Sequence, residues 1–104
     1  MNNRTNYLPI GSIVQLKESN IRIMIIARCV SATIQDKRYY LDYVGCVFPF
    51  GMDKDEVLYF SEEDIETIHF KGYANDEEVL MQDILNKAKV DFNLPKGSVR
   101  MFMN

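Results

Sequence analysis

The most informative segment of this chain is residues 39–52, which read Tyr39-Tyr40-Leu41-Asp42-Tyr43-Val44-Gly45-Cys46-Val47-Phe48-Pro49-Phe50-Gly51-Met52. The segment holds five of the twelve aromatic residues, since the chain has six Tyr, six Phe and no Trp. Its first part is rich in the aromatic and β-branched residues that favour strands, and it ends in a rigid apolar turn with proline and glycine. It predicts a β-strand over residues 38–47, followed by a sharp corner.

This strand places one carboxylate among apolar side chains. Because side chains alternate between the two faces of a strand, Asp42 shares a face with Tyr40, Val44 and Cys46. Asp42 therefore needs either an exposed strand end or a positively charged partner. The candidate partners are Arg22, Arg28 and Arg38.

Turn signals on either side of residues 38–47 delimit further strands. These strands are expected at residues 13–17, 21–30, 57–60 and 65–70. Residues 31–37 are polar and predict a loop. In the last strand, Ile68 and Phe70 are expected to point inward and His69 toward solvent.

One long helix is expected from Asp76 to about Val90, with Asn75 as its N-cap. An apolar stripe runs along one side of this helix. The stripe comprises Val79, Leu80, Met81, Ile84, Leu85 and Ala88. We expect it to cover the core rather than to form a docking face. A single helical turn is expected at residues 61–64, with the Ser61 hydroxyl as its cap.

These elements predict one α+β domain over residues 1–104. Its expected architecture is a small, bent antiparallel β-sheet or SH3-like barrel of about five strands, with the C-terminal helix packed on it. An open sheet with the helix across one face is the second architecture that fits. Residues 1–7 and 93–104 are expected to be loose or peripheral, with residues 99–103 either a terminal strand or a free tail.

Composition excludes several classes of protein. A net charge of −3 with scattered basic residues argues against nucleic-acid binding. The N-terminus lacks the apolar run of a signal peptide, and residues 23–27, the longest apolar run, are far too short to cross a bilayer. A cytoplasmic protein is therefore expected, with Cys29 and Cys46 as reduced core thiols.

The sequence carries no recognisable catalytic or ligand-binding signature. His69 is the single histidine, and two cysteines with one histidine cannot supply four zinc ligands without carboxylates. The glycines are too scattered to form a phosphate-binding loop. We therefore expect no enzyme activity, cofactor or metal, and an enzyme using Asp42 and His69 is kept only as an alternative.

The corner after residue 47 is the candidate binding site. Phenylalanine and methionine are enriched in the cores of protein interfaces, and a Phe-Pro-Phe-Gly turn is too short to bury every ring it carries. The expected partner-binding residues are Phe48, Pro49, Phe50, Met52 and Tyr59. The competing interpretation is that Phe48 and Phe50 close one end of the core.

Several segments together resemble one family. They are residues 8–17, 24–28, 41–46, 48–51, 60–65 and 70–73. They read Leu-Pro-Ile-Gly-Ser-Ile-Val-Gln-Leu-Lys, Met-Ile-Ile-Ala-Arg, Leu-Asp-Tyr-Val-Gly-Cys, Phe-Pro-Phe-Gly, Phe-Ser-Glu-Glu-Asp-Ile and Phe-Lys-Gly-Tyr. On these segments the chain resembles the domain-of-unknown-function family numbered 4176, small proteins of Gram-positive Firmicutes.

The resemblance implies a role beside exported toxins. Members of the family often lie next to genes for LXG-type toxins of the type VII secretion system. This setting implies an adaptor, chaperone or targeting factor whose partner is a co-encoded secreted toxin or its small helical partners. The alternatives are an immunity protein that neutralises a toxin domain and a structural interaction module of other function, and a homodimer is compatible with each of them.

Overall fold

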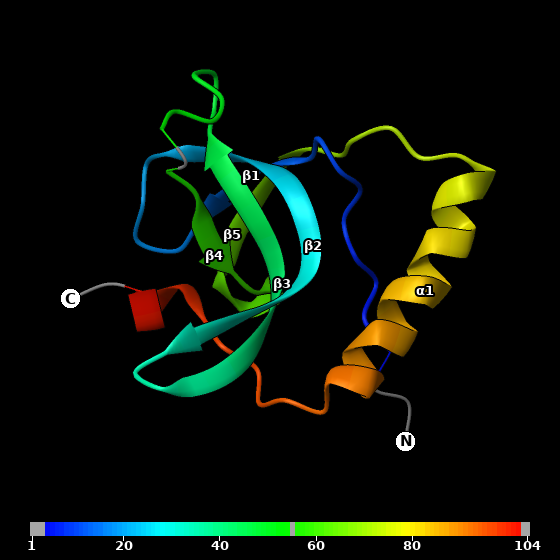
Figure 1. Ribbon diagram of the computed structural model, residues 1–104. Helices are drawn as coiled ribbons and strands as arrows, with labels where there is room; N and C mark the ends of the chain where they lie inside the picture. Colours follow the sequence, from blue (N-terminus) through cyan, green and yellow to red (C-terminus); the bar gives the residue numbers. More distant parts are fainter. Residues whose placement is uncertain (1–3, 55, 103–104) are drawn as a thin grey trace.

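The computed structural model describes residues 4–54 and 56–102 (Figure 1). The strands are β1 (Ile13–Leu16), β2 (Arg22–Ile34), β3 (Lys37–Val47), β4 (Leu58–Phe60) and β5 (Ile65–Phe70). The helices are α1 (Asp76–Phe92) and the short 3-10 helices η1 (Glu62–Asp64) and η2 (Val99–Phe102). The α+β class, the strand count and the C-terminal helix are confirmed.

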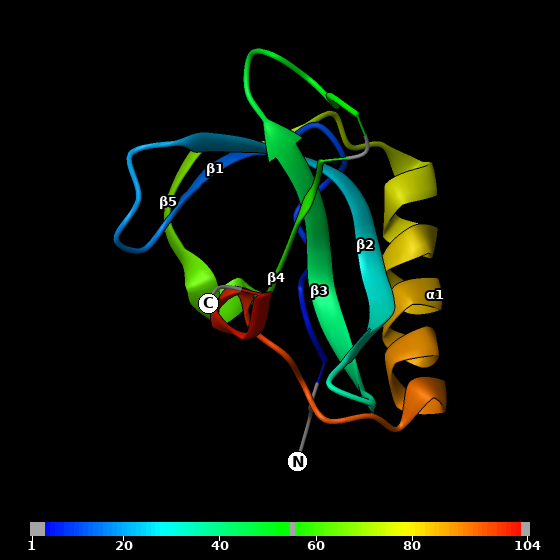
Figure 2. The same ribbon diagram turned by 60° about the vertical axis from the view of Figure 1, so that its left-hand side comes forward.

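The five strands form one antiparallel sheet in the order β4-β3-β2-β1-β5. The register between β2 and β3 shifts between Ile25 and Ala27, which is a β-bulge and increases the local twist. Figures 1 and 2 show the sheet bending so that its two edges curve toward the same side. The edge strands β4 and β5 do not pair with each other, so the sheet is open and does not close into a barrel.

The long hairpin of β2 and β3 differs from the sequence prediction. Residues 31–37 are not a loop, because β2 continues to Ile34 and β3 begins at Lys37. Only Gln35 and Asp36 connect the strands, and both have positive φ, 51° and 67°, as in the tight type I′ turn. This turn usually contains Asn-Gly or Asp-Gly. Gln35-Asp36 has neither dipeptide, which explains why the sequence predicted a loop over residues 31–37 instead of a hairpin turn.

The N-terminal segment joins the hydrophobic core that packs on the sheet. Tyr43 packs against Phe60, with ring centroids 5.4 Å apart, and Tyr7 meets Tyr43 edge-on at 6.0 Å. The Leu8 N–H donates to the Tyr43 hydroxyl at 2.9 Å. Tyr7 and Thr5 are buried, so the expectation that residues 1–7 are loose is wrong for this part; residues 1–3 lie outside the described residues.

Helix α1 packs on this assembly mainly through polar side chains, and only part of its apolar stripe contributes. Arg28 of β2, whose side chain is almost fully buried, forms a two-pronged ion pair with Glu78. Gln82 and Asn86 bond to the backbone of residues 5–7, which lies between α1 and β2 in Figure 1. Of the predicted stripe, only Leu85 and Ala88 join the core, whereas the other members are exposed: Val79, Leu80, Met81 and Ile84.

The chain after α1 returns to the sheet. Tyr40 of β3 donates its N–H to the Pro95 carbonyl at 3.0 Å and accepts from the Gly97 N–H at 2.8 Å, so residues 95–97 extend the sheet beside β4. Residues 99–102 form η2 rather than a strand or a free tail, and Met103 lies outside the described residues. Much of 93–104 is therefore anchored, with Gly97 buried.

Candidate functional site

The corner after β3 is held at both ends by backbone bonds. The Phe48 N–H donates to the Arg22 carbonyl at 2.8 Å, and the Gly51 N–H donates to the Val47 carbonyl at 2.9 Å. Gly51 has φ of +80°, a conformation that glycine adopts without steric cost. The peptide bond between Phe48 and Pro49 is cis. The two hydrogen bonds, from the Phe48 N–H and the Gly51 N–H, hold the backbone that carries the aromatic rings.

The corner exposes its large side chains. Phe50 is 83% exposed and Phe48 44% exposed, while Pro49 and Met52 are also on the surface. When a partner covers an apolar ring that was exposed to water, the burial of its surface contributes favourable free energy to binding. The interpretation that Phe48 and Phe50 close the core therefore does not describe this structure.

Phe48 belongs to a larger apolar surface that the sequence did not predict. It lines a shallow hollow of about 480 Å³ with Ile13, Met24 and Phe70, and His69 stands at its side. Ile13 lies opposite Met24 in β2 and opposite Phe70 in β5, so the three side chains share one face of the sheet. Phe48 thus connects the corner to the β1–β2–β5 face. We call the two together the aromatic face, which comprises the exposed Phe48, Phe50 and Phe70, the half-buried Met24 and the buried Ile13. Phe50 belongs to the corner and does not line the hollow.

The prediction that Ile68 and Phe70 point inward is wrong. Phe70 is 59% exposed and Ile68 is also exposed. The strand β5 pairs only with β1, and its register against β1 shifts twice, so simple alternation from Ile65 does not hold along it. The sequence did not reveal this exposure, because the edge position of β5 follows only from the order of the strands in the sheet.

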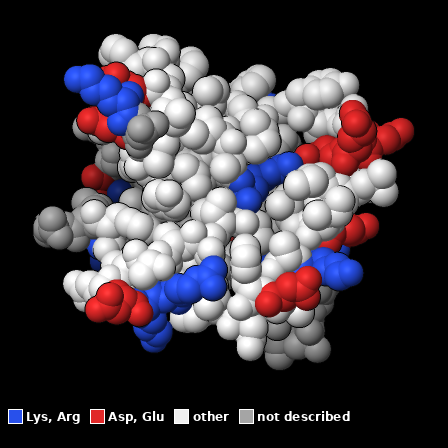
Figure 3. Space-filling view, viewed as in Figure 1, with Lys and Arg blue, Asp and Glu red and all other residues white. Residues whose placement is uncertain are grey.

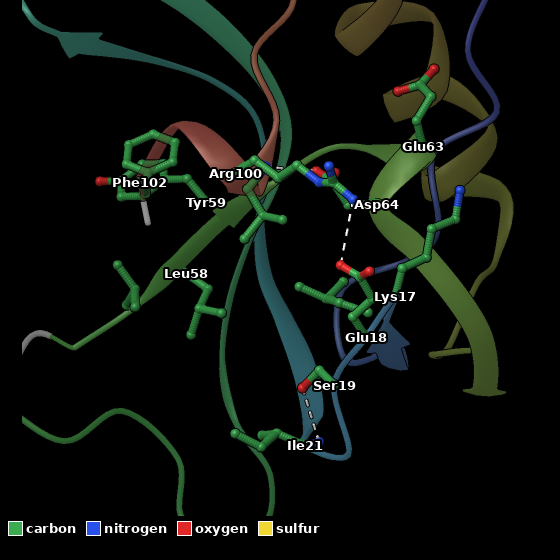
Figure 4. Close-up of a pocket in the computed structure, with 13 residues that line it drawn as sticks. Lys17, Glu18, Ser19, Ile21, Leu58, Tyr59, Glu63, Asp64, Arg100 and Phe102 are labelled. Carbon is green, nitrogen blue, oxygen red and sulfur yellow. Dashed lines mark hydrogen bonds and ion pairs between the residues drawn. The ribbon is translucent and has the colours of Figure 1, made fainter. Parts of the chain in front are cut away.

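Tyr59 lies on a different surface. Its ring stacks on Phe102 of η2, with centroids 5.1 Å apart, and it is only partly exposed. Both rings line a groove of about 740 Å³ between β4, η2 and the loop after β1 (Figure 4). No residue of the aromatic face lines this groove, so the structure does not join Tyr59 to the other predicted contact residues.

The groove has an apolar floor and a charged rim. Leu16, Leu58 and Val99 contribute apolar side chains. Arg100 and Glu18 form an exposed ion pair at 3.4 Å on the rim, drawn as a dashed line in Figure 4. Sequence reasoning missed this groove because its walls come from segments as far apart as residues 16–21 and 99–102.

Asp42 is fully buried, and its partner is not one of the predicted arginines. The carboxylate accepts from the Tyr40 hydroxyl and from the Glu62 N–H, both at 2.8 Å, and pairs with the Lys96 ammonium at 3.0 Å. Burial alone would lower the pKa of Lys96, but its bonds to Asp42 and Glu63 raise that pKa above the usual value. Burial and the nearby Asp42 carboxylate raise the pKa of Tyr40 to about 12. This arrangement neutralises Asp42 within the fold.

The single histidine lies away from this cluster. As expected, His69 is exposed, and its Nε2 lies 2.9 Å from Gln15 Oε1. The structure therefore does not bring Asp42 and His69 into contact with a common partner. In the part of the chain that the structure describes, no three His, Cys, Asp or Glu side chains are placed to hold a metal ion.

The helix η1 forms as predicted, but the Ser61 hydroxyl has a different partner. It donates to the Gly97 carbonyl at 2.8 Å, while the Asp64 carboxylate accepts from the Ser61 N–H. Ser61 thus ties η1 to the C-terminal segment.

Among the described residues no helix has the length and apolar character needed to span a bilayer.

The comparisons with known proteins give one result. Residues 7–81 match the family model described as Domain of unknown function (DUF4176). The matched range begins at the buried Tyr7, includes the whole sheet and ends within α1. No curated protein and no solved structure matches the chain.

Proposed function

The chain belongs to the DUF4176 family, and we propose that it is a non-enzymatic cytoplasmic accessory protein that binds another protein through its aromatic face. The observation that carries this proposal is the exposure of Phe48, Phe50 and Phe70 on a backbone held by β-sheet pairing. Large exposed apolar patches on soluble proteins mark interaction sites. A fixed backbone loses little conformational entropy on binding, which leaves more of the burial free energy for affinity.

The surface of the molecule supports this choice of partner. Figure 3 shows a face that is largely uncharged, with a few basic side chains near its middle and acidic side chains mostly at its margins. The hollow of the aromatic face is lined mainly by apolar side chains, with Arg22 and His69 as its polar members. A surface with few charges offers little to a nucleic acid, whose affinity comes largely from contacts with phosphates. An apolar segment of another protein fits such a surface better, with aromatic anchors at its centre.

We further propose that the partner is an LXG-type toxin of the type VII secretion system, or one of the small helical proteins encoded with it. The family resemblance supports this part of the proposal. In that role the protein acts as a chaperone, adaptor or targeting factor, and the aromatic face covers an apolar part of the toxin before export.

Co-purification and export assays test the proposal together. The untagged protein should co-purify in a defined stoichiometric complex with a toxin encoded beside it, and its deletion should abolish export of that toxin. The triple variant Phe48→Ser, Phe50→Ser, Phe70→Ser should lose both effects while remaining folded. Protection of cells from the toxin without any effect on export would assign the immunity role instead.

A further inference from the structure

The outer side of α1 carries four residues at the spacing of a coiled-coil seam. Glu77, Leu80, Ile84 and Lys87 follow one another at intervals of three, four and three residues. This spacing keeps side chains on one side of a helix, where a second helix can pack against them. Leu80 is 65% exposed and Ile84 is 58% exposed. We call these four residues the outer stripe.

The outer stripe faces away from the rest of the molecule. The side of α1 that contacts the body carries Glu78, Gln82 and Asn86, whose bonds to Arg28 and residues 5–7 fix the rotation of the helix. At 3.6 residues per turn, Leu80 and Ile84 point to the opposite side. Figure 1 shows this side of α1 at the right-hand margin, with no other element beyond it.

The first and last residues of the outer stripe carry charges of opposite sign. Glu77 lies in the first turn of α1, and Lys87 lies ten residues further along. In the described part of the chain, no salt bridge uses either of them. By contrast, Asp83 on the neighbouring flank is paired with Arg4 at 2.6 Å. Figure 3 shows acidic side chains gathered at the upper right, over the start of α1.

We propose that the outer stripe binds a second copy of this chain, with the two α1 helices antiparallel about a twofold axis. When Leu80 packs on Ile84 of the other copy, the same register places Glu77 opposite Lys87, because both pairs have position numbers that sum to 164. The twofold axis repeats each pair, which gives two apolar contacts and two ion pairs from one stripe. A parallel arrangement would instead place Glu77 against Glu77 and Lys87 against Lys87.

This dimer uses a surface separate from the aromatic face, so it goes beyond the proposed function. A pair of helices of this length makes an interface at the small end of the usual range. We therefore expect reversible association in the micromolar range, with a mass of twice 12.1 kDa at high concentration. Sedimentation equilibrium of the full chain from about 1 μM to about 1 mM measures it.

Charge exchange gives the sharpest test. Glu77→Lys alone and Lys87→Glu alone should each weaken self-association about tenfold or more, because each change makes both ion pairs repulsive. The double variant Glu77→Lys, Lys87→Glu recreates two complementary pairs and should associate about as strongly as the wild type. A lysine in the first turn also destabilises the helix, because its charge opposes the helix dipole. The double variant contains the same lysine, so its recovery of association cannot come from a more stable helix.

A matched control separates the outer stripe from general stickiness. Val90 is 71% exposed on the same helix but lies outside the outer stripe. Val90→Thr should leave association unchanged, whereas Leu80→Asp should abolish it, and thermal unfolding should show that both variants are folded. A wild-type chain that stays at 12.1 kDa throughout, or a double variant no better than the single ones, would overturn the proposal.

Discussion

Lys96 shows how a single residue can complete a buried site from far along the chain. Asp42 was correctly expected to need a partner, but the sequence suggested arginines from the neighbouring strands. The partner comes from residues 95–97, which pair with Tyr40 and bring the ammonium group to the carboxylate. Nothing in the local pattern around Asp42 points to a residue that is distant in sequence, so this contact could not be predicted from the sequence.

Removal of Lys96 should leave Asp42 without its counter-charge. We expect Lys96→Met to lower the free energy of unfolding by about 3 kcal/mol, because an unpaired charge remains buried. Urea denaturation measures the change, with the exposed Lys71→Met as control. Adding Asp42→Asn should recover part of the loss. If Lys96→Met proves as harmless as Lys71→Met, the ion pair does not stabilise the fold.

The buried tyrosines should make stability fall at high pH. Burial raises the pKa of Tyr40 and of Tyr43 to about 12, from an ordinary value of 10.0. The unfolded chain therefore loses these protons first, so their contribution is complete below pH 10.0 and is lost between pH 10.0 and about 12. Denaturation at several pH values should show this decline, and it should be smaller in Tyr43→Phe. A Tyr43→Phe protein with an unchanged pH slope would contradict this assignment.

The strands and the ends of α1 were predicted better from the sequence than the side that α1 turns toward the sheet. The existence of the strands and the Asn75 cap depend on neighbouring residues, and the structure confirms both, although alternation fails along β5. The orientation of α1 depends on residues 5–7, whose backbone groups lie against the helix and need hydrogen-bond partners. Gln82 and Asn86 supply them, so polar residues face inward and the apolar Leu80 and Ile84 face out.

Asn86 should therefore matter more to stability than the exposed leucine on the same helix. Its amide accepts from the Thr5 N–H at 2.7 Å and donates to the Thr5 carbonyl at 2.9 Å. We expect Asn86→Leu to lower the free energy of unfolding by about 2–3 kcal/mol, because buried backbone groups lose their partners. Leu80→Ser should change it by less than about 0.5 kcal/mol. The reverse order in urea denaturation would show that α1 packs through its apolar stripe.

Segments from both ends of the chain cover the open sheet. Residues 5–8 lie between the sheet and α1, and residues 95–102 lie beside β3 and β4. The sequence predicted an α+β domain and its strand count because those follow from local patterns. It missed the groove and the aromatic face because both combine segments that only the tertiary fold brings together.

The two cysteines report on opening of the whole domain. Both are buried and unbonded, as predicted. Cys46 lies opposite Met24, which is five residues from Cys29 along β2, roughly 16 Å at the usual rise per residue. Burial also raises the pKa of the Cys29 thiol. Native protein should react slowly with a thiol reagent, and denatured protein should show two free thiols; fast reaction in the native state would contradict this packing.

The most direct test of a binding role for the aromatic face compares two equally exposed aromatic residues. Phe50 is 83% exposed and Tyr73, outside that face, is 82% exposed. Calorimetric titration with the partner should show that Phe50→Ala lowers affinity about thirtyfold, which corresponds to about 2 kcal/mol for covering one ring, with little change in melting temperature. Tyr73→Ala should bind as the wild type does. Equal losses in both variants, or unfolding of the domain by Phe50→Ala, would contradict the assignment of the aromatic face as the binding surface.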